Sequence, residues 1–493
     1  MKKDGTMVAL KNKAILDGGA YTSFGIATVY YSGSLLGGPY NLKAMKYDGY
    51  RVYTNKPTCG AQRGHGGVAH RAAFEQLLDM TAEKLGIDPV EMRLKNMMVT
   101  GETTINELNM SSLGMKECIE AVRNGSDWDN KKGKLPKGKG IGMACGFFVS
   151  GAGYPIYRSD TYHSTVVIKV IEDGGIVNVL TGSAEIGQGS DTAMAMIAAE
   201  TLGIPLENVR VISGDTDLSV DLGAYSSRQT LMTGHATKEA AESVRRQIAE
   251  VVAEQMGYDL KDITFEEGKV LFKGGPGDFE KFRTYYTKEH RGWTDSPGGD
   301  YLTFKEAARM AYLAKGTIVG TGKYKPPKLG GSYKGAAVGT SPAYGCSAQI
   351  VEVTVDLETG EVTVDRMTDA HDCGLAVNRA SVEGQMQGSL SMGLGETLFE
   401  EVKFDSRGRI VNASLGEYRI PTALDMPNVN TIIVESNEPN GPYGAKEVGE
   451  GAIMPTIPAI LNAIYDATGV RVNELPVSSE RLYVATKQQE KEQ

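Results

Sequence analysis

Helical spacing of apolar residues is clearest near the N-terminus. Over Val68–Leu85 apolar side chains recur every three or four residues, which predicts an amphipathic helix that ends at Gly86. Asp88 and Pro89 then suit the cap and the first position of a second helix, expected to continue to about Met98. The same kind of pattern predicts further helices over residues 191–202, 236–257 and 454–468.

Short apolar runs and hairpin signals predict the strands. Residues 7–10 and 50–53 are expected to be strands, and so are both arms of two hairpins, Thr165–Leu180 and Gln349–Val364. Each hairpin leads into a glycine-rich loop and a helix, which predicts two related halves that each offer a loop to one ligand. Strands and helices mix without a strict βαβ alternation, so we expect an α+β fold with two lobes, whose hairpins and glycine-rich loops converge on one cofactor.

Two irregular stretches separate these elements. Residues 125–140 are polar and basic and contain proline and glycine, so they are expected to be a linker. We therefore predict a first domain over residues 1–130 and a second over residues 131–493. Residues 274–300 are expected to form a surface excursion.

Composition narrows the class of protein. The 493 residues are 41% hydrophobic and 23% charged, which is ordinary for a globular protein. Glycine, with 61 residues, is more frequent than usual. The net charge of −9 argues against general nucleic-acid binding, which needs a basic face. With no run of about 18 apolar residues and no apolar leader at the start, neither a membrane span nor a signal peptide is expected.

The cysteines and histidines do not form metal-binding patterns. The five cysteines are odd in number and widely spaced and contain no C-x-x-C pair, which argues against a disulfide framework, a structural zinc site or an iron–sulfur cluster in this chain. The six histidines have no H-x-x-x-H or H-x-H spacing. A reducing cytoplasm is the expected compartment.

Polar residues flanked by glycines are the strongest functional signal. Glycine lets backbone N–H groups approach a ligand closely, and five such segments from distant parts of one chain suggest one large anionic cofactor held by many small contacts. One glutamate would then be left for chemistry. The five residues are Arg63 before Gly64, Gln188 in Gly187-Gln188-Gly189, Ser226 after Gly223, Gln385 after Gly384 and Glu450 between Gly449 and Gly451.

Plainer interpretations of two of these segments remain open. The turn around Gln188 could be a tight turn capped by Ser190 or Asp191 rather than a phosphate loop. Glu450 could complement the N-terminus of the following helix, or it could be a general base at the mouth of a pocket. Local context does not decide between these alternatives.

The order of the motifs resembles one protein family. Gly-Gln-Gly near the middle, Glu-Gly-Gln later and Val-Gly-Glu near the end are similar to the molybdopterin-binding subunit of the xanthine oxidase family of molybdenum hydroxylases. The resemblance covers essentially the whole chain, but only the C-terminal two-thirds or so of a full family subunit. Within the family the chain is most similar to the α subunits of 4-hydroxybenzoyl-CoA reductases, on the segments Tyr47–Val52, Arg63–Gly66, Tyr225–Arg228 and Pro439–Glu447.

The resemblance implies a cofactor and roles for the polar residues. Molybdenum would be held by the dithiolene of a pyranopterin with no side-chain ligand, and the pterin would be plain molybdopterin or its cytosine dinucleotide form. Glu450 would be the base next to the metal, and Arg63 would lie beside the oxygen ligands of the metal. Gln188 and Gln385 would hydrogen-bond the pterin. The remaining cofactor-binding residues would be Gly187, Gly189, Gly449 and the backbone of Ala224, Tyr225, Ser226 and Ser227, which would pack against the ligand face of the metal.

The implied reaction is the reductive dehydroxylation of an aromatic acyl-CoA. Many purine-oxidising relatives have phenylalanine where this chain has His65, and an arginine near Tyr30 and Tyr31, so purine is less expected than another aromatic ring. Tyr31 and His65 are the expected substrate-pocket residues. The alternative is a xanthine dehydrogenase-like hydroxylase of an N-heterocycle, purine or aldehyde. A non-catalytic scaffold fragment is the alternative from another class.

The resemblance also implies partners. Electrons need an iron–sulfur subunit and a flavin subunit carrying FAD, because no cluster-binding cysteine pattern is present in this chain. A further chain is expected to supply the N-terminal part of the molybdopterin domain, unless that part is absent. The substrate is a small molecule, and neither nucleic acid nor membrane is expected as a partner.

Overall fold

A computed structural model describes residues 1–151, 161–274, 301–329 and 340–492. The chain forms two compact units: Met1–Arg158 with Pro327–Gln493, and Ser159–Pro326. These units do not test the boundary expected after residue 130, which stays a prediction. The excursion expected at 274–300 lies outside the described residues apart from its first position.

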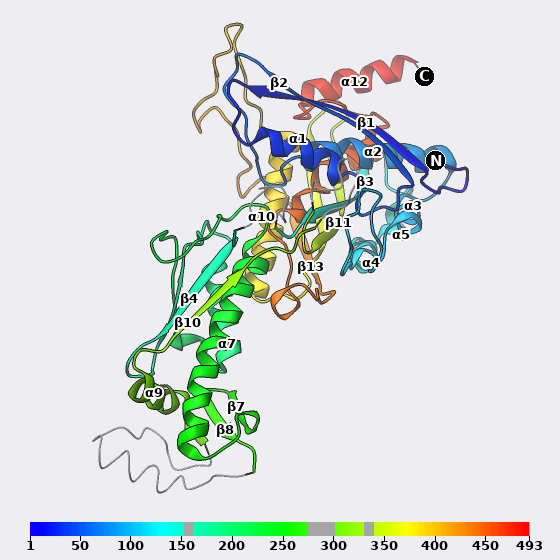
Figure 1. Ribbon diagram of the computed structural model, residues 1–493. Coiled ribbons are helices and arrows are strands. Elements are labelled where there is room, and N and C mark those ends of the chain that lie inside the picture. The colour runs from blue at the N-terminus through cyan, green and yellow to red at the C-terminus, as the bar shows by residue number, and fades with distance from the viewer. Residues whose placement is uncertain (152–160, 275–300, 330–339, 493) are drawn as a thin grey trace. The chain divides into compact units, whose positions relative to one another are not determined.

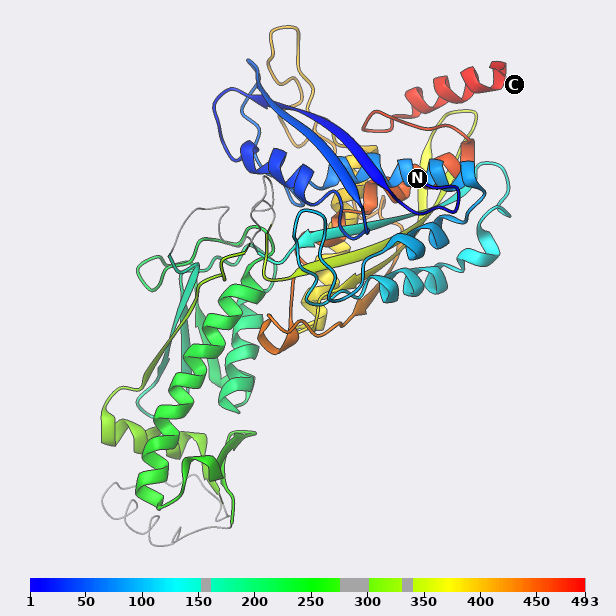
Figure 2. The same cartoon turned by 45° about the vertical axis from the view of Figure 1, so that its right-hand side comes forward.

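The first unit begins with a pair of parallel strands. β1 (Ala9–Gly19) pairs with β2 (Ala44–Tyr53), and α1 (Gly25–Ser34) lies between them in the chain and packs on both. Figure 2 shows this pair in blue with α1 beside it. α2 (Val68–Leu85) and α3 (Pro89–Asn96) follow.

A four-stranded sheet forms the centre of the first unit. Its order is β13 (Asn428–Val434), β12 (Val362–Asp372), β11 (Tyr344–Val355) and β3 (Lys139–Val149), and only β13 runs parallel to its neighbour. Successive residues of a strand point to opposite faces, so β11 is buried on both sides. α4 (Met115–Ser126) packs on one face, and α11 (Thr456–Thr468) packs on the other.

Two glycines let α11 approach the sheet closely. A Cβ at Gly140 or Gly142 of β3 would collide with backbone atoms of α11 around Ala463 and Ala467. α10 (Arg379–Leu398) packs against α11 in turn, and α12 (Ser479–Glu492) ends the unit. α11 follows the loop that carries Glu450. Its packing on the sheet therefore also fixes where that loop ends.

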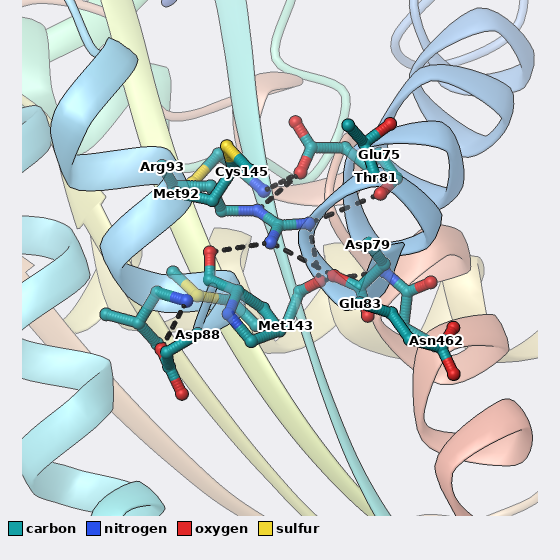
Figure 3. Close-up of polar contacts among 12 residues, drawn as sticks. Glu75, Asp79, Thr81, Glu83, Asp88, Met92, Arg93, Met143, Cys145 and Asn462 are labelled. Carbon is teal, nitrogen blue, oxygen red and sulfur yellow. Dashed lines mark hydrogen bonds and ion pairs between the residues drawn. The ribbon is translucent and has the colours of Figure 1, made fainter. Parts of the chain in front are cut away.

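A buried cluster of charges joins α2, α3 and β3. The Arg93 guanidinium lies 2.8 Å from Glu75 Oε2 and 3.0 Å from Asp79 Oδ1, and it donates to the Met143 carbonyl over 3.1 Å. Figure 3 shows these contacts. The Tyr40 hydroxyl donates to Glu75 over 2.7 Å, so the carboxylate is held from two sides. The cluster ties the helices to the central sheet.

The second unit has its own core. Its main sheet has the order β10 (Val319–Tyr324), β4 (Ser164–Val170), β5 (Val177–Thr181) and β6 (Val209–Ile212). α7 (Gln229–Met256) runs along β10 and β4 and also contacts α6 (Ser190–Leu202), as Figure 1 shows for α7. A small sheet of β7 (Ile263–Glu266), β8 (Lys269–Phe272) and β9 (Tyr301–Thr303) precedes α9 (Phe304–Lys315).

Most predicted elements are confirmed. The first helix spans Val68–Leu85 and ends at Gly86, whose φ is 66°. Asp88 caps α3 by accepting from the amides of Val90 and Glu91. Both hairpins are present as β4–β5 and β11–β12, so the mixed α+β class is confirmed.

The linker expected at 125–140 is wrong. α5 (Trp128–Lys131) lies within this stretch, and Trp128 is only 1% exposed. Its indole Nε1 donates to Asp88 Oδ2 over 3.0 Å, which ties the stretch to the start of α3. The polar residues of 125–140 lie mostly on the outer side of this segment, which packs through Trp128.

Short 3₁₀ turns complete the described elements at Leu206–Asn208, Leu260–Asp262, Pro442–Gly444 and Gly451–Ile453. In the residues that the structure describes, none of the helices combines the length and the apolar character needed to span a membrane.

Candidate functional site

Arg63 connects three segments that are far apart in the sequence. It lies in the loop before α2, and its Nη2 donates to the side-chain oxygen of Gln385 over 2.9 Å and to the Gln385 carbonyl over 3.1 Å. Its Nε donates to the carbonyl of Gly449. One guanidinium therefore fixes the positions of α10 and of the loop that carries Glu450.

Glu450 points toward the Arg63 loop. Its Oε1 accepts hydrogen bonds from the Gly64 amide over 2.9 Å and from His65 Nδ1 over 3.2 Å. Its side chain does not cap the 3₁₀ turn that follows it, and it is 12% exposed. The side chain therefore does not serve as a cap of that turn, and its role as a general base stays a prediction.

His65 is enclosed by aromatic rings. The ring centroids of Tyr31, Phe148 and Phe24 lie 4.7, 5.5 and 6.0 Å from that of His65, all in edge-on arrangements. The His65 side chain is 3% exposed, and its Nε2 has no hydrogen-bond partner in the described part of the chain. Since an ionised Glu450 can only accept, His65 carries its proton on Nδ1. The two predicted pocket residues, Tyr31 and His65, therefore lie together.

Gln385 lies in a helix rather than in the expected glycine-rich loop. α10 begins at Arg379, and Asn378 caps it by accepting from the Ser381 amide, so Gln385 falls in its second turn. Arg63 holds the side-chain oxygen of Gln385, which leaves the amide NH₂ as the donor end. Apart from the chain neighbours of Gly384 and the backbone of its own helix, no atom of the described residues lies within 4 Å of the Cβ position at Gly384, so there is open space beside this helix.

The Gly187–Gly189 turn of the second unit is closed by its own side chains. The Glu185 carboxylate accepts from the amides of Gly187 and Gly189 over 2.8 and 3.0 Å, and from the Asp191 amide over 3.1 Å. Burial acts to raise the pKa of Glu185, but these amides outweigh it and lower the pKa. Glu185 thus takes the position that a bound anion would take at the N-terminus of α6.

Gln188 also bonds within its own loop. Its Nε2 donates to Ser190 Oγ over 2.9 Å and to the Ala184 carbonyl over 3.1 Å, while its Oε1 accepts from the Ile186 amide over 2.6 Å. The loop is thus a turn closed by its own side chains, but the cap expected from Ser190 or Asp191 is wrong, because the α6 N-cap residue is Gly189 and Glu185 accepts from the amides. Pterin binding by Gln188 stays a prediction. Glu185 was missed because an acidic residue two positions before a glycine carries no specific signal.

The loop before α7 holds a strained pair of serines. Ser226 and Ser227 have φ values of 53° and 50°, a left-handed conformation that is uncommon outside glycine and clusters at functional sites. Ser226 Oγ is buried and has no hydrogen-bond partner among the described residues. Arg228 holds the loop by its 2.9 Å ion pair with Asp221, and its guanidinium lies over the ring of Tyr225. The contact of Ala224–Ser227 with a cofactor stays a prediction.

The structure thus brings together Arg63, His65, Tyr31, Gln385, Gly449 and Glu450 in the first unit. The loops of Gln188 and of Ser226 belong to the second unit and are described by themselves. The donors offered by the first unit, a guanidinium and an amide NH₂ beside open space at Gly384, fit an acceptor-rich group such as a pterin.

Behind Glu450, a buried carboxyl on β12 gives a test of the local electrostatics. Burial raises the pKa of Asp369 from 3.8 to about 7. Below about pH 4 the group is protonated in both the folded and the unfolded chain. Between about pH 4 and 7 only the unfolded chain loses the proton, so the free energy of unfolding falls as the pH rises through this window.

Asp369→Asn is therefore expected to stabilise the chain with a defined pH profile. Its advantage over the wild type grows from about pH 4 to 7 and levels off above, with an upper limit of about 4 kcal/mol. Urea unfolding midpoints measured across this range test the expectation. An advantage that is the same at every pH would contradict a raised pKa at Asp369.

Comparison with known proteins gives a consistent result. The model of a molybdopterin cofactor-binding domain matches residues 119–427, and a second model with the same description matches residues 1–97. The putative xanthine dehydrogenase molybdenum-binding subunit of Escherichia coli is 32% identical over 501 aligned residues. The aldehyde oxidoreductase of Megalodesulfovibrio gigas is 29% identical, with 99% of this chain and 48% of that protein covered.

A solved structure agrees in fold. The crystal structure of quinoline 2-oxidoreductase from Pseudomonas putida 86 superposes with a TM-score of 0.85 at 27% identity and covers 98% of this chain and 61% of that one. The alignment with the E. coli subunit likewise covers 98% of this chain but only 61% of the relative. The chain therefore spans about three fifths of the length of these two relatives.

Proposed function

This chain belongs to the molybdopterin-binding subunits of the xanthine oxidase family of molybdenum hydroxylases, and on that premise we propose that it supplies the base and part of the cofactor cradle of a molybdenum-dependent oxidoreductase. The observation that carries the proposal is the convergence on Glu450. Its carboxylate accepts from Gly64 and His65, while Arg63 fixes the neighbouring Gly449 carbonyl.

The residues fit the cofactor through their donor chemistry. We assign Arg63 and the Gln385 amide as donors to the pterin and to the oxygen ligands of the metal. Gln188, the flanking Gly187 and Gly189, and the backbone of Ala224–Ser227 remain candidates on the second unit. We propose that the pterin is molybdopterin or its cytosine dinucleotide form.

The proposed chemistry separates into what the cofactor supplies and what the protein does. When bound, the molybdenum cofactor supplies the two-electron redox chemistry. Replacing C–H by C–OH with the oxygen of water releases two electrons and two protons. The electrons would be accepted by the cofactor, and Glu450 takes up one of the protons. The Gly64 amide and the His65 Nδ1–H hold the carboxylate in one orientation. Such hydrogen bonds contribute more to catalysis in a site from which water is excluded.

We propose oxidative hydroxylation of an N-heterocycle, a purine or an aldehyde as the reaction. The related proteins carry names of this kind, namely xanthine dehydrogenase, aldehyde oxidoreductase and quinoline 2-oxidoreductase. They favour the alternative that the sequence left open over the reductive dehydroxylation of an aromatic acyl-CoA.

Partners follow from the family. The relative from E. coli is named as a subunit, so we propose an assembly in which other chains carry the iron–sulfur clusters and FAD. The described cysteines are all free, which is in keeping with the cytoplasm that we propose as the compartment.

The direction of turnover is tested on the complex isolated through this chain from its native host. Quinoline, hypoxanthine and benzaldehyde are offered with an oxidised dye as electron acceptor, and 4-hydroxybenzoyl-CoA is offered with a reduced dye as donor. We expect dye reduction with at least one of the first three. If only 4-hydroxybenzoyl-CoA reacts, by oxidising the donor dye, reductive dehydroxylation would be favoured over hydroxylation.

A further inference from the structure

Four buried polar side chains lie behind the loop that carries Glu450. Ser347 and Gln349 of β11 pair directly with His371 and Asp369 of β12, and alternate residues of a strand share a face. All four side chains belong to residues that are 0% exposed. A two-by-two group of polar residues in the middle of a sheet needs partners, because buried polar groups without them destabilise the fold.

Three of the four side chains have backbone carbonyls of the Glu450 loop as partners, and Asp369 has none among the described residues. Ser347 Oγ donates to the Gly451 carbonyl over 2.9 Å, and Gln349 Nε2 donates to the Ala452 carbonyl over 2.7 Å. The Nε2 of His371 lies 2.9 Å from the Glu447 carbonyl oxygen. The sheet thus holds the loop on both sides of Glu450.

Glu447 completes this arrangement from within the loop. Its Oε2 accepts from the Gly451 amide over 3.1 Å and from the Glu450 amide over 3.4 Å, while its Oε1 lies 3.4 Å from His371 Nε2. The side chains of Glu447 and His371 are both 0% exposed. The carboxylate therefore binds the backbone of Glu450 directly and rests against the sheet.

Two glycines leave room for this carboxylate. A Cβ at Gly345 of β11 would collide with the side chain of Glu447, and a Cβ at Gly451 would collide with the same carboxylate from the loop side. At Gly345 the atoms nearest to such a Cβ are all from Glu447, and its φ is outside the left-handed range. The backbone there would accept alanine, so the absence of a side chain is explained by the space that Glu447 occupies.

The charge of Glu447 is also balanced locally. Burial acts to lower the pKa of His371, but the Glu447 and Asp369 carboxyls outweigh it and raise the pKa of the imidazole. An imidazole that gains a proton more readily supplies a counter-charge beside the Glu447 carboxylate.

We propose that Glu447 is a positioning residue for the base: held by His371, its carboxylate fixes the backbone of Glu450 so that the Glu450 carboxylate meets Gly64 and His65. The proposal rests on the proposed role of Glu450. It assigns no chemistry to Glu447 itself, which acts through the orientation of its neighbour. Groups that orient a reacting side chain commonly change rates by 10- to 100-fold.

Two variants disturb the same carboxylate in different ways. Glu447→Gln keeps the shape and removes the charge, and Gly345→Ala pushes on the Glu447 carboxylate from β11, with only Glu447 atoms as the nearest neighbours of the added Cβ. In the molybdenum-loaded complex, both are expected to lower kcat by about 10-fold or more and to leave KM within about twofold, since the bound substrate is held by other groups.

The matched control is Glu438→Gln. Glu438 is 1% exposed, and its carboxylate accepts from Ser111 and Ser112 rather than from the backbone of Glu450. The Glu438→Gln variant shows how much stability is lost when one buried charge is removed from the same unit. We expect its unfolding temperature to fall about as far as that of Glu447→Gln, while its kcat stays within about twofold of the wild type.

A second readout does not depend on turnover. Amide hydrogen exchange of a peptide covering residues 446–453 is expected to speed up in Glu447→Gln and Gly345→Ala and to stay unchanged in Glu438→Gln, with molybdenum content unaltered in all three. Unchanged kcat and exchange in both test variants would overturn the proposal. Loss of molybdenum from both, with unchanged exchange, would also overturn it by assigning Glu447 to cofactor retention.

Failure of the proposed function would look different. If Glu450→Gln keeps its activity, the role of Glu450 is wrong whatever the Glu447 variants do. If Glu450→Gln is inactive while both Glu447-directed variants turn over normally, only the positioning role is wrong.

Discussion

Glu450→Gln is expected to leave the molybdenum content of the complex intact and to reduce kcat by about 10³-fold or more. Removing a general base accounts for about 10²- to 10⁴-fold. The Glu450 side chain binds the Gly64 amide and His65 Nδ1 and makes none of the hydrogen bonds by which Arg63 fixes Gln385. An amide in its place can still accept from Gly64 but cannot take up a proton, so cofactor binding and proton transfer separate in this variant.

The comparison needs molybdenum per chain and steady-state kinetics for the wild type and the variant. Glu474→Gln is the matched control, because Glu474 is a 71% exposed side chain of the same unit, paired with Arg481. It is expected to behave like the wild type. Turnover of Glu450→Gln within tenfold of the wild type, at equal molybdenum content, would remove Glu450 from the reaction.

Arg93→Met is expected to destabilise the first unit by about 3–5 kcal/mol. Arg93 is 0% exposed and pairs with Glu75 and Asp79. Its loss leaves the buried Asp79 without an ion pair among the described residues, and Glu75 with only the longer 3.7 Å pair to Arg71. Figure 3 shows that the cluster also reaches Met143 of β3, so the packing of α2 and α3 on the sheet weakens with it. For Arg93→Met we therefore expect a smaller yield of folded chain and a lower urea midpoint of unfolding.

Arg123→Met provides the control for this effect. Arg123 also contacts two carboxylates, Glu91 and Asp129, but its side chain is 26% exposed and theirs are 52% and 62% exposed. Pairs of this kind contribute about 0–1 kcal/mol. Equal losses of stability in the two variants would contradict the view that burial makes the Arg93 cluster important.

Local signals explain which elements the sequence could predict. α2 and α3 follow from apolar spacing, the glycine stop at Gly86 and the Asp88 cap, all of which act within a few residues. Residues 125–140 were misjudged because Trp128 is buried through a contact with Asp88, forty positions away. Composition measures average polarity and cannot report a contact of that kind.

The candidate site divides in the same way. The order of the glycine-flanked motifs pointed to Arg63 and Glu450, but the partners of Glu450 come from positions more than 380 residues earlier. Glu447 stands only three positions before Glu450, yet its role depends on His371 and on the space left by Gly345. Such roles follow from sheet register and packing, which are set by the whole unit.

The most direct measurement is the molybdenum and released pterin of the complex isolated through this chain from its native host. The account predicts about one molybdenum and one pterin per chain, together with partner chains that carry iron–sulfur clusters. The form of the released pterin then decides between molybdopterin and its cytosine dinucleotide. A complex without molybdenum, from a host that makes the cofactor, would contradict the account and favour a non-catalytic scaffold.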